Sequence, residues 1–200
     1  MEGKKGIIIA GGVIGIMSAL LVFFGNPANM GFCIACFIRD TAGGLGLHRA
    51  AVVQYIRPET IGLVLGAFLI AMKNKEFESK GGSAPFIRFM LGLVVMIGAL
   101  IFLGCPLRMV LRLAGGDLNA LFAIAGFVFG IIIGVQFLNK GFNLKRNYKM
   151  TQAEGYIYPI INLGFLILLL ASPAFIFFSE SGPGSMAAPI AIALAAGIVG

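Results

Sequence analysis

The chain has 200 residues, of which 59% are apolar and only 12% are charged, and its mean hydropathy is +0.99. The charged share is about half that of an ordinary globular domain, so this composition excludes a soluble enzyme or soluble binding module. The formal net charge of +7 comes without a basic patch that carries interleaved aromatic side chains, so no nucleic-acid partner is expected. We expect membrane topology to explain the positive charge.

Six apolar runs predict membrane-spanning helices. The first follows the basic start Met1–Lys5 and is too long for a cleaved signal peptide, so we interpret it as a retained signal anchor. The second run is short unless it extends back through Arg57, Pro58 and Glu59. The last run meets the end of the chain without a basic flank, which predicts that the chain is part of a longer protein. The runs are Gly6–Phe24, Thr60–Met72, Phe86–Leu103, Leu118–Leu138, Ile157–Phe178 and Ala187–Gly200.

The cations sort between two sides of the membrane when the six runs cross it alternately. One side receives ten cations, including all eight lysines, and the other receives five, all of them arginines. The excess places the N-terminus in the cytoplasm of a multi-pass protein of the inner (plasma) membrane. Arginine, unlike lysine, offers a planar fork for an oxyanion or a backbone carbonyl. The five outer arginines are Arg39, Arg49, Arg57, Arg108 and Arg112.

All three cysteines lie in two polar segments on that outer side, Gly31–Asp40 and Gly104–Met109. Each segment places an arginine three residues after a cysteine. Guanidinium and thiol groups within hydrocarbon-rich sequence point to a function, and they suit a sulfur- or selenium-containing anion that crosses the membrane. Two plainer interpretations stay open. The cysteines can pack as small apolar residues, and the arginines can pair with Asp40, Glu59 and Asp117.

The two polar segments belong to blocks of similar order, which we interpret as an internal repeat. Gly25-Asn26-Pro27 aligns with Gly104-Cys105-Pro106, and each block continues into an Ala-Gly-Gly element and a span with a Gly-x-x-x-Gly spacing. The predicted fold class is an all-α polytopic membrane protein with repeated span–broken segment–span units and about six spans. Residues 1–84 and 85–150 form the two predicted repeat units, and residues 151–200 start a further half. The spaced glycines are Gly62 with Gly66 and Gly126 with Gly130.

The first block resembles the YedE/YeeE membrane proteins, and within them the YedE-related selenium metabolism membrane protein. The resemblance runs through Gly25–Asp40 and Leu45–Glu59, returns at Gly104–Asp117 and Ser181–Ser185, and covers essentially the whole chain. It implies a sulfur-transport-type membrane protein in which cysteines line a central path for thiosulfate or a related anion. It also implies a link to selenium metabolism and a partner in that cytoplasmic pathway. Members are usually longer, with further cysteine motifs in a second half.

The expected function is therefore transport of a small inorganic sulfur or selenium anion, with membrane lipid as the other partner, and not catalysis. Arg39 and Arg108 are expected to attract the anion, while Asn26 and Asn29 donate amide N–H groups to it. Guanidinium and thiol groups from separate hairpins are expected to line one conduit, in which thiols bind weakly enough for release. The predicted path thiols are Cys33, Cys36 and Cys105, and the secondary anion-binding candidates are Arg49, Arg57, Arg112 and His48.

Other functions compete with transport. Cys33-x-x-Cys36 has the spacing of a redox dithiol, which favours a membrane thiol or persulfide enzyme. A membrane scaffold that recruits selenium-processing proteins is a further alternative, although the short basic loops resemble lipid-facing anchors and topology signals more than docking domains. A metal site of the cysteines with His48 has no recognised spacing beyond the first pair. We predict no catalytic residue, cofactor or metal. We also expect no buried carboxylate in mid-span, and hence no visible residue for proton or sodium coupling.

Overall fold

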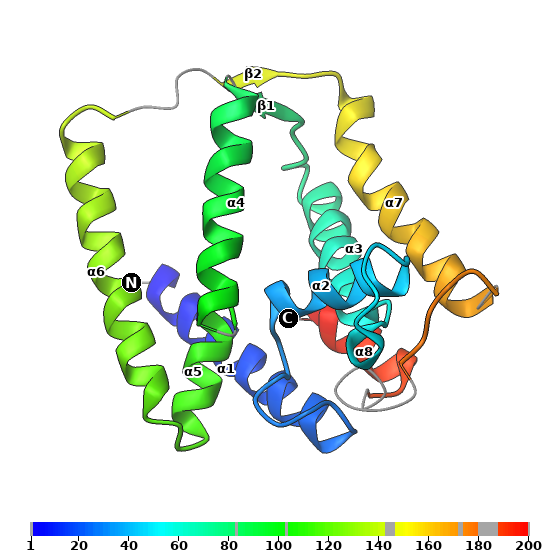
Figure 1. The fold of residues 1–200 in the computed structure, drawn as a ribbon. Helices are drawn as coiled ribbons and strands as arrows, with labels where there is room; N and C mark the ends of the chain where they lie inside the picture. The colour runs from blue at the N-terminus through cyan, green and yellow to red at the C-terminus, as the bar shows by residue number, and fades with distance from the viewer. Residues whose placement is uncertain are drawn as a thin grey trace. The chain divides into compact units, whose positions relative to one another are not determined.

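A computed structural model describes residues 2–82, 84–102, 104–142, 147–171, 174–179 and 188–199, with side chains from residue 5 onward. Over these residues the chain is mainly helical, with one two-stranded sheet (Figure 1). It divides into unit 1, Met1–Phe77 with Tyr156–Gly200, and unit 2, Glu78–Gly155. The predicted second repeat unit, 85–150, falls within unit 2. Most of the predicted first repeat unit, 1–84, and most of the predicted further half, 151–200, belong to unit 1. The predictions for Lys145, Arg146 and Ser181–Ser185 lie outside the described residues.

Within the described residues, five stretches are long and apolar enough to cross a membrane. The expected sixth span is represented by helix α8, Ile190–Val199, which has 10 residues. At ~1.5 Å per residue such a helix is about 15 Å long, half of a ~30 Å hydrocarbon core. The described residues therefore show five candidate spans. These are Lys5–Phe23, Ala51–Lys73, Pro85–Ala114, Asn119–Asn139 and Gln152–Ala171.

Proline sets the start of three helices. Pro58, Pro85 and Pro106 each occupy the first turn, where the missing N–H costs nothing and the fixed φ suits a helix. The second apolar run therefore extends back to Pro58, one of the two outcomes that its length allowed. Unit 1 contains α1 (Glu2–Phe23), α2 (Ile34–Gly44), the short helix η1 (Ala51–Val53), α3 (Pro58–Lys73), most of α7 (Gln152–Ala171) and α8.

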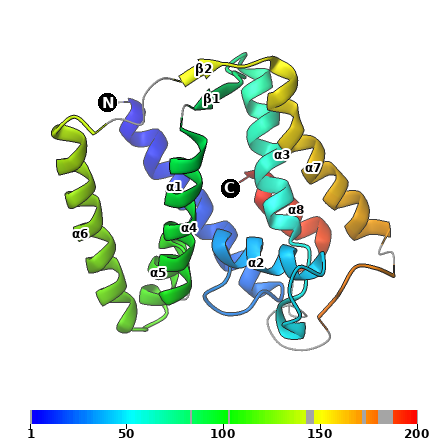
Figure 2. The ribbon, with the colours of Figure 1, turned by 45° about the horizontal axis from the view of Figure 1, so that its top comes forward.

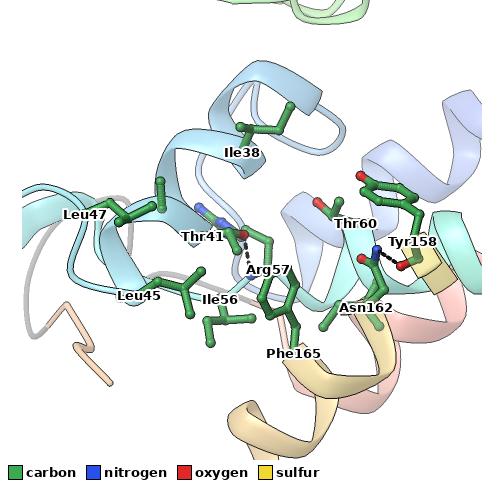
Figure 3. A pocket seen from close by; sticks show the side chains of 12 residues that line it. Ile38, Thr41, Leu45, Leu47, Ile56, Arg57, Thr60, Tyr158, Asn162 and Phe165 are labelled. Carbon is green, nitrogen blue, oxygen red and sulfur yellow. Dashed lines mark hydrogen bonds between the residues drawn. The ribbon is translucent and has the colours of Figure 1, made fainter. Parts of the chain in front are cut away.

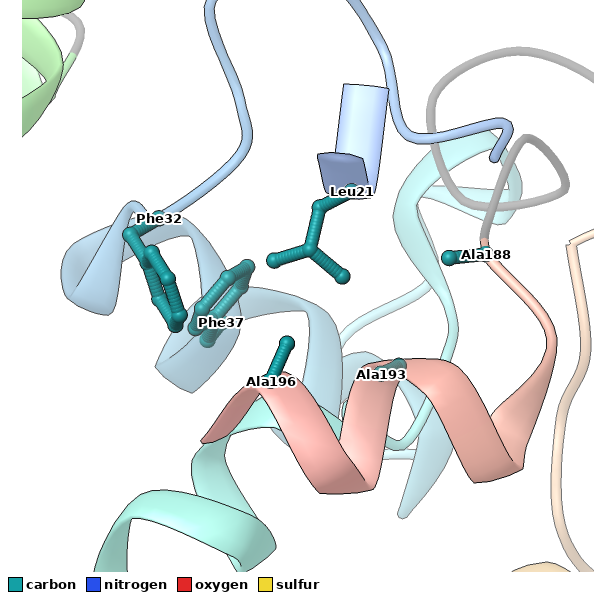
Figure 4. Close-up of a cluster of buried hydrophobic side chains, with 6 residues drawn as sticks. All are labelled: Leu21, Phe32, Phe37, Ala188, Ala193 and Ala196. Atoms are coloured by element: carbon teal, nitrogen blue, oxygen red, sulfur yellow. The ribbon is translucent and has the colours of Figure 1, made fainter. Parts of the chain in front are cut away.

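The core of unit 1 joins the two ends of the chain (Figure 4). Leu21 of α1 packs with Phe37 of α2 and with Ala193 and Ala196 of α8, and all four side chains are buried. The segment after α7 is tied to the loop between α2 and α3, since the N–H of Ser179 donates to the carbonyl of Gln54 at 2.7 Å. This hydrogen bond holds the segment after α7 beside the loop between α2 and α3.

Helix α8 packs against α3, and the backbones of the two helices lie in direct contact (Figures 1 and 2). A Cβ at Gly62 would lie 2.3 Å from the carbonyl oxygen of Leu194, and one at Gly197 would lie 2.3 Å from that of Glu59. A Cβ at Gly66 would meet the carbonyl of Ile198 at 2.7 Å. Only glycine permits this approach, which is the packing that small residues give between membrane helices.

Unit 2 repeats the order of a long, a short and a long helix. Its second long helix, α6, carries the glycine pair Gly126 and Gly130. A Cβ added at either glycine would have no described atom within 4 Å, so these glycines, unlike those of α3, are not needed for close packing within the described residues. Whether the two blocks descend from a duplication stays a prediction. The elements are β1 (Lys80–Gly82), α4 (Pro85–Ile101), α5 (Pro106–Ala114), α6 (Asn119–Asn139) and β2 (Asn147–Lys149), with β1 antiparallel to β2.

The long helices expose apolar side chains on most of their surface. In α4 no residue is buried, and Phe86, Val95 and Ile101 are among its largely exposed side chains. In water such helices would leave extensive apolar surface uncovered, whereas lipid solvates it. The exposure agrees with a membrane protein.

We predict that Gly62→Ala and Gly197→Ala destabilise unit 1 by about 1–3 kcal/mol, because the new methyl group collides with a backbone oxygen. Thermal unfolding of the purified protein in detergent, followed by circular dichroism, measures the loss. Gly126→Ala in α6 is the matched control, and its midpoint should equal or slightly exceed that of the unsubstituted protein. Equal midpoints for all three variants would contradict the close packing of α3 and α8.

Candidate functional site

The centre of unit 1 holds charged side chains that are closed off from solvent. Arg57 lies in extended backbone directly before α3, and Glu59 lies in the first turn of that helix. Asp40 lies in α2. The side chains of Asp40, Arg57 and Glu59 are all 0% exposed. Charged groups so deeply buried in a membrane protein are costly and therefore indicate a function or an essential structural role.

Asp40 binds two guanidinium groups at once. Its Oδ2 accepts hydrogen bonds from Nε and Nη2 of Arg57 at 2.8 and 2.6 Å. Its Oδ1 accepts from Nε and Nη2 of Arg39 at 2.9 and 2.7 Å. Such charge-assisted, forked hydrogen bonds are the strong ones in proteins. Asp40 thereby ties α2 to the start of α3 and has four donors around its carboxylate.

Glu59 has far fewer donors. Its Oε1 accepts a hydrogen bond from Nδ2 of Asn26 at 2.8 Å, while Nη1 of Arg57 lies 3.9 Å away, beyond hydrogen-bond reach. Its Oε2 has no hydrogen-bond partner among the described residues. Oδ1 of Asn26 in turn accepts from the N–H of Ala188, just before α8, at 2.8 Å. Asn26 therefore uses both ends of its amide within the protein, although the sequence suggested it as a donor to the anion.

Two aromatic rings cover the guanidinium of Arg57. Its Cζ lies 5.6 Å from the ring centroid of Phe37 and 5.3 Å from that of Tyr55. The N–H of Tyr55 also donates to the carbonyl of Asp40 at 3.0 Å. Cation–π contacts of this kind gain strength where water is excluded. The rings and the carboxylate together hold Arg57 in one orientation.

A pocket of about 220 Å³ lies beside this network, between α2, the segment before α3 and α7. Figure 3 shows Thr60, Tyr158 and Asn162 at one end of it and Leu45 and Leu47 at the opposite end. The hydroxyl oxygen of Thr60 is buried and has no hydrogen-bond partner among the described residues. Arg57 also lines the pocket, together with Ile38, Thr41, Ala42, Ile56, Ile61 and Phe165.

The three predicted path cysteines are buried. Cys33 is the N-cap residue of α2 and is 0% exposed, and Cys36 lies one turn further on at 5%. Cys105 is the N-cap residue of α5 in unit 2 and is 9% exposed. Each of the two short helices thus begins at a cysteine. Cys36 and Arg39 share a face of α2 because they are three residues apart.

The two arginines of α5, Arg108 and Arg112, contact different residues. A Cβ at Gly104 would lie 2.6 Å from Cδ of Arg108, so Arg108 packs over that glycine. Nε of Arg112 donates to Oδ2 of Asp117 at 2.8 Å, and its Nη1 donates to the carbonyl of Phe102 at 3.0 Å. Arg112 therefore ties α5 to the end of α4 and to the turn before α6.

The remaining predicted residues lie at the edge of unit 1. Asn29 is half-buried, with a positive φ of 62°. The guanidinium of Arg49 stacks on Phe177, with Cζ 4.8 Å from the ring centroid. His48 donates from Nε2 to the carbonyl of Arg39 at 2.9 Å and accepts at Nδ1 from the N–H of Ala50. Among the described residues, no three His, Cys, Asp or Glu side chains are grouped to hold a metal ion.

The structure thus brings Cys33, Cys36, Arg39 and Arg57 into one unit and assigns Cys105 to the other. Pairing with carboxylates, the plainer interpretation, describes Arg39, Arg57 and Arg112. Glu59 is a buried carboxylate, but it lies in the first turn of α3, so it does not contradict the expectation that no buried carboxylate lies in mid-span. The sequence analysis missed the pocket residues Thr60, Tyr158 and Asn162. The spacing of Tyr158 and Asn162, four residues apart in an apolar run, is the signal that could have found them.

Comparison of the chain with protein-family models, curated proteins and solved structures finds no match. The assignment of a function therefore rests on the residues and contacts described above.

We predict that Asp40→Asn destabilises unit 1 by about 3–5 kcal/mol, because it leaves the fully buried guanidinium of Arg57 against a neutral amide without its compensating charge. Thermal unfolding in detergent, followed by labelling of the buried thiols with a maleimide, measures the effect. Glu76→Gln, at an exposed position of the same unit, is the control and should unfold like the unsubstituted protein. A midpoint for Asp40→Asn equal to that of the control would show that the network contributes no stability.

A second prediction concerns pH. The hydrogen bond from the Arg112 guanidinium holds the pKa of Asp117 below its ordinary value of 3.8. The stabilising contribution of a carboxylate with a lowered pKa is complete above the ordinary value, and it is lost as the pH falls through the lowered one. NMR titration of the Asp117 carboxyl carbon should show this lowered pKa, and Arg112→Gln should raise it. An unchanged titration in the variant would contradict the pair.

Proposed function

We propose that this protein is a membrane transporter for a small inorganic anion that contains sulfur or selenium, as its resemblance to the YedE/YeeE proteins implies. The observation that carries the proposal is the pair of short helices, α2 and α5, each of which begins at a buried cysteine and carries arginine. In chain order α2 lies between α1 and α3, and α5 lies between α4 and α6, at the end of the candidate span Pro85–Ala114. Short helices between spans provide N–H groups and side chains for a solute where a continuous helix would provide neither.

The chemistry of α2 fits such an anion. Arg39 is 35% exposed, and its Nη1 makes no hydrogen bond to the described residues, while its other nitrogens engage Asp40. An open donor on a guanidinium attracts an oxyanion. Cys36, on the same face, offers a sulfhydryl group, which is a weak donor and a soft contact for terminal sulfur or selenium. Weak binding at successive thiols allows release as well as entry.

Two contacts support alternate crossing of the membrane by the spans. The loops that the sequence assigns to the cytoplasmic side pair through β1 and β2, with Lys80 opposite Lys149. The loops assigned to the outer side are joined by the hydrogen bond between Ser179 and Gln54. Alternate crossing requires both groupings, and lysines in the paired loops suit the anionic cytoplasmic leaflet.

Burial of the dithiol counts against the redox enzyme. Reactive cysteines in oxidoreductases are partly exposed, whereas Cys33 and Cys36 are 0% and 5% exposed. A scaffold function has no comparable support, because nothing in a recruiting role calls for thiols and guanidinium groups inside the protein. We therefore retain transport alone.

We predict that Cys33→Ala, Cys36→Ala and Cys105→Ala each lower uptake of labelled thiosulfate or selenite several-fold in cells that express the protein. Val110→Ala, an exposed position of α5, is the control and should transport normally. All variants must reach the membrane in equal amounts, which a blot of the membrane fraction checks. Normal uptake in all three cysteine variants would remove the thiols from the mechanism.

A further inference from the structure

The two buried carboxylates of unit 1 differ in the number of their donors. Asp40 accepts four hydrogen bonds from two guanidinium groups, whereas Glu59 accepts one, from the neutral amide of Asn26. Glu59 is 0% exposed, and its Oε2 has no partner among the described residues. A proton can therefore be added at Oε2 without breaking any hydrogen bond described for the network. Asp40 cannot accept one without losing a bond to arginine.

We infer that Glu59 is a proton-binding residue, and that a proton on its Oε2 favours binding of the anion in the pocket lined by Arg57 and Thr60. The identity of the anion rests on the proposed function, but the proton site does not. With Glu59 ionised, the charges of Asp40 and Glu59 balance those of Arg39 and Arg57. With Glu59 protonated, one positive charge is left uncompensated beside the buried guanidinium of Arg57.

An uncompensated charge in such a site interacts strongly with a nearby anion, because little water screens it. An anion in the pocket lies beside Arg57, whose side chain is 0% exposed and held by Asp40, so the two charges interact through space and not by direct contact. The Thr60 hydroxyl, beside Glu59 in the chain, faces the same pocket without a hydrogen-bond partner among the described residues. A hydroxyl both donates and accepts, so it can bind the anion or pass a proton.

Reciprocity follows from thermodynamic linkage. If the proton strengthens binding of the anion, the anion strengthens binding of the proton by the same factor. A proton and an anion that enter together from the outer side would use the proton gradient to drive uptake. This supplies the coupling residue that the sequence lacked.

The titratable and charged groups on the elements around Glu59 are few. Helix α8 packs on the backbone of Glu59 and carries no titratable side chain between Ile190 and Val199. The loop after α1 contributes the neutral Asn26. The groups on the remaining elements are Asp40 and Arg39 of α2, Tyr55 and Arg57 of the segment before α3, and Tyr158 of α7.

Infrared spectroscopy of the purified protein tests the proton site without any transport. As the pH is lowered, the C=O stretch of a protonated, buried carboxyl group should appear, and it should be missing in Glu59→Gln. This variant keeps an oxygen for the Asn26 amide and resembles the protonated form. Glu76→Gln, an exposed glutamate, is the control and should keep the band. Identical bands in the unsubstituted protein and Glu59→Gln would overturn the inference.

If Glu59→Gln does not fold, the unsubstituted protein still decides the question. Addition of thiosulfate at a fixed pH should increase the protonated-carboxyl band, and a buried carboxyl band absent at every pH at which the protein stays folded would overturn the inference.

Uptake into proteoliposomes tests the coupling. An inward proton gradient should stimulate thiosulfate uptake on the order of tenfold, within the usual range for coupled sites. Glu59→Gln should abolish the stimulation but preserve exchange of internal for external thiosulfate. Equal stimulation in the variant would overturn the coupling. If the unsubstituted protein moves no sulfur or selenium anion at all, the proposed function fails, while the infrared result still decides whether Glu59 binds a proton.

Discussion

The ion pair between Asp40 and Arg57 is the interaction on which unit 1 depends. Both side chains are fully buried, and two hydrogen bonds of 2.6 and 2.8 Å join them. Because removal of either partner leaves a charge without compensation, the segment before α3 must stay beside α2. Arg39 and the rings of Phe37 and Tyr55 complete the enclosure. A membrane interior tolerates such a group only when its charges are neutralised internally.

Close helix packing places the rest of unit 1 around this pair. The contact of α3 with α8 through Gly62, Gly66 and Gly197 leaves no room for side chains between the two backbones. It also brings the start of α8 to Asn26, whose amide bridges Ala188 and Glu59. Glycine spacing and the polar network are therefore coupled, because a shift of α8 would withdraw the donor of Ala188. Packing of α8 thus helps to hold the amide of Asn26 in the orientation that donates to Glu59.

Arginine and lysine make different kinds of contact in this chain, in keeping with their chemistry. The arginines make forked or stacked contacts with Asp40, Asp117 and Phe177, which require a planar group with several donors. Lys80 and Lys149, by contrast, lie exposed on the small sheet and pair with Glu78. Its pKa is lowered by the hydrogen bond from Lys80, as expected for a carboxylate between two ammonium groups. Compact, hydrated charges suit a loop at the membrane surface.

The sequence by itself determined the helical class with apolar runs of membrane length, and the existence of polar breaks with cysteine and arginine. These follow from composition and from runs of apolar residues, both of which act locally. Of the six expected spans, the described residues show five, and the sixth stays a prediction. Pairing of Arg57 with Asp40, across 17 residues, and of Asn26 with Ala188, across 162, was decided only by the tertiary structure. A hydrogen bond depends on distances in space, and neither the type of a residue nor its neighbours in the chain specify which distant backbone will supply a donor. For the same reason the sequence marked Glu59 as charged, while only the fold showed that it is buried beside Arg57 with one oxygen lacking a donor among the described residues.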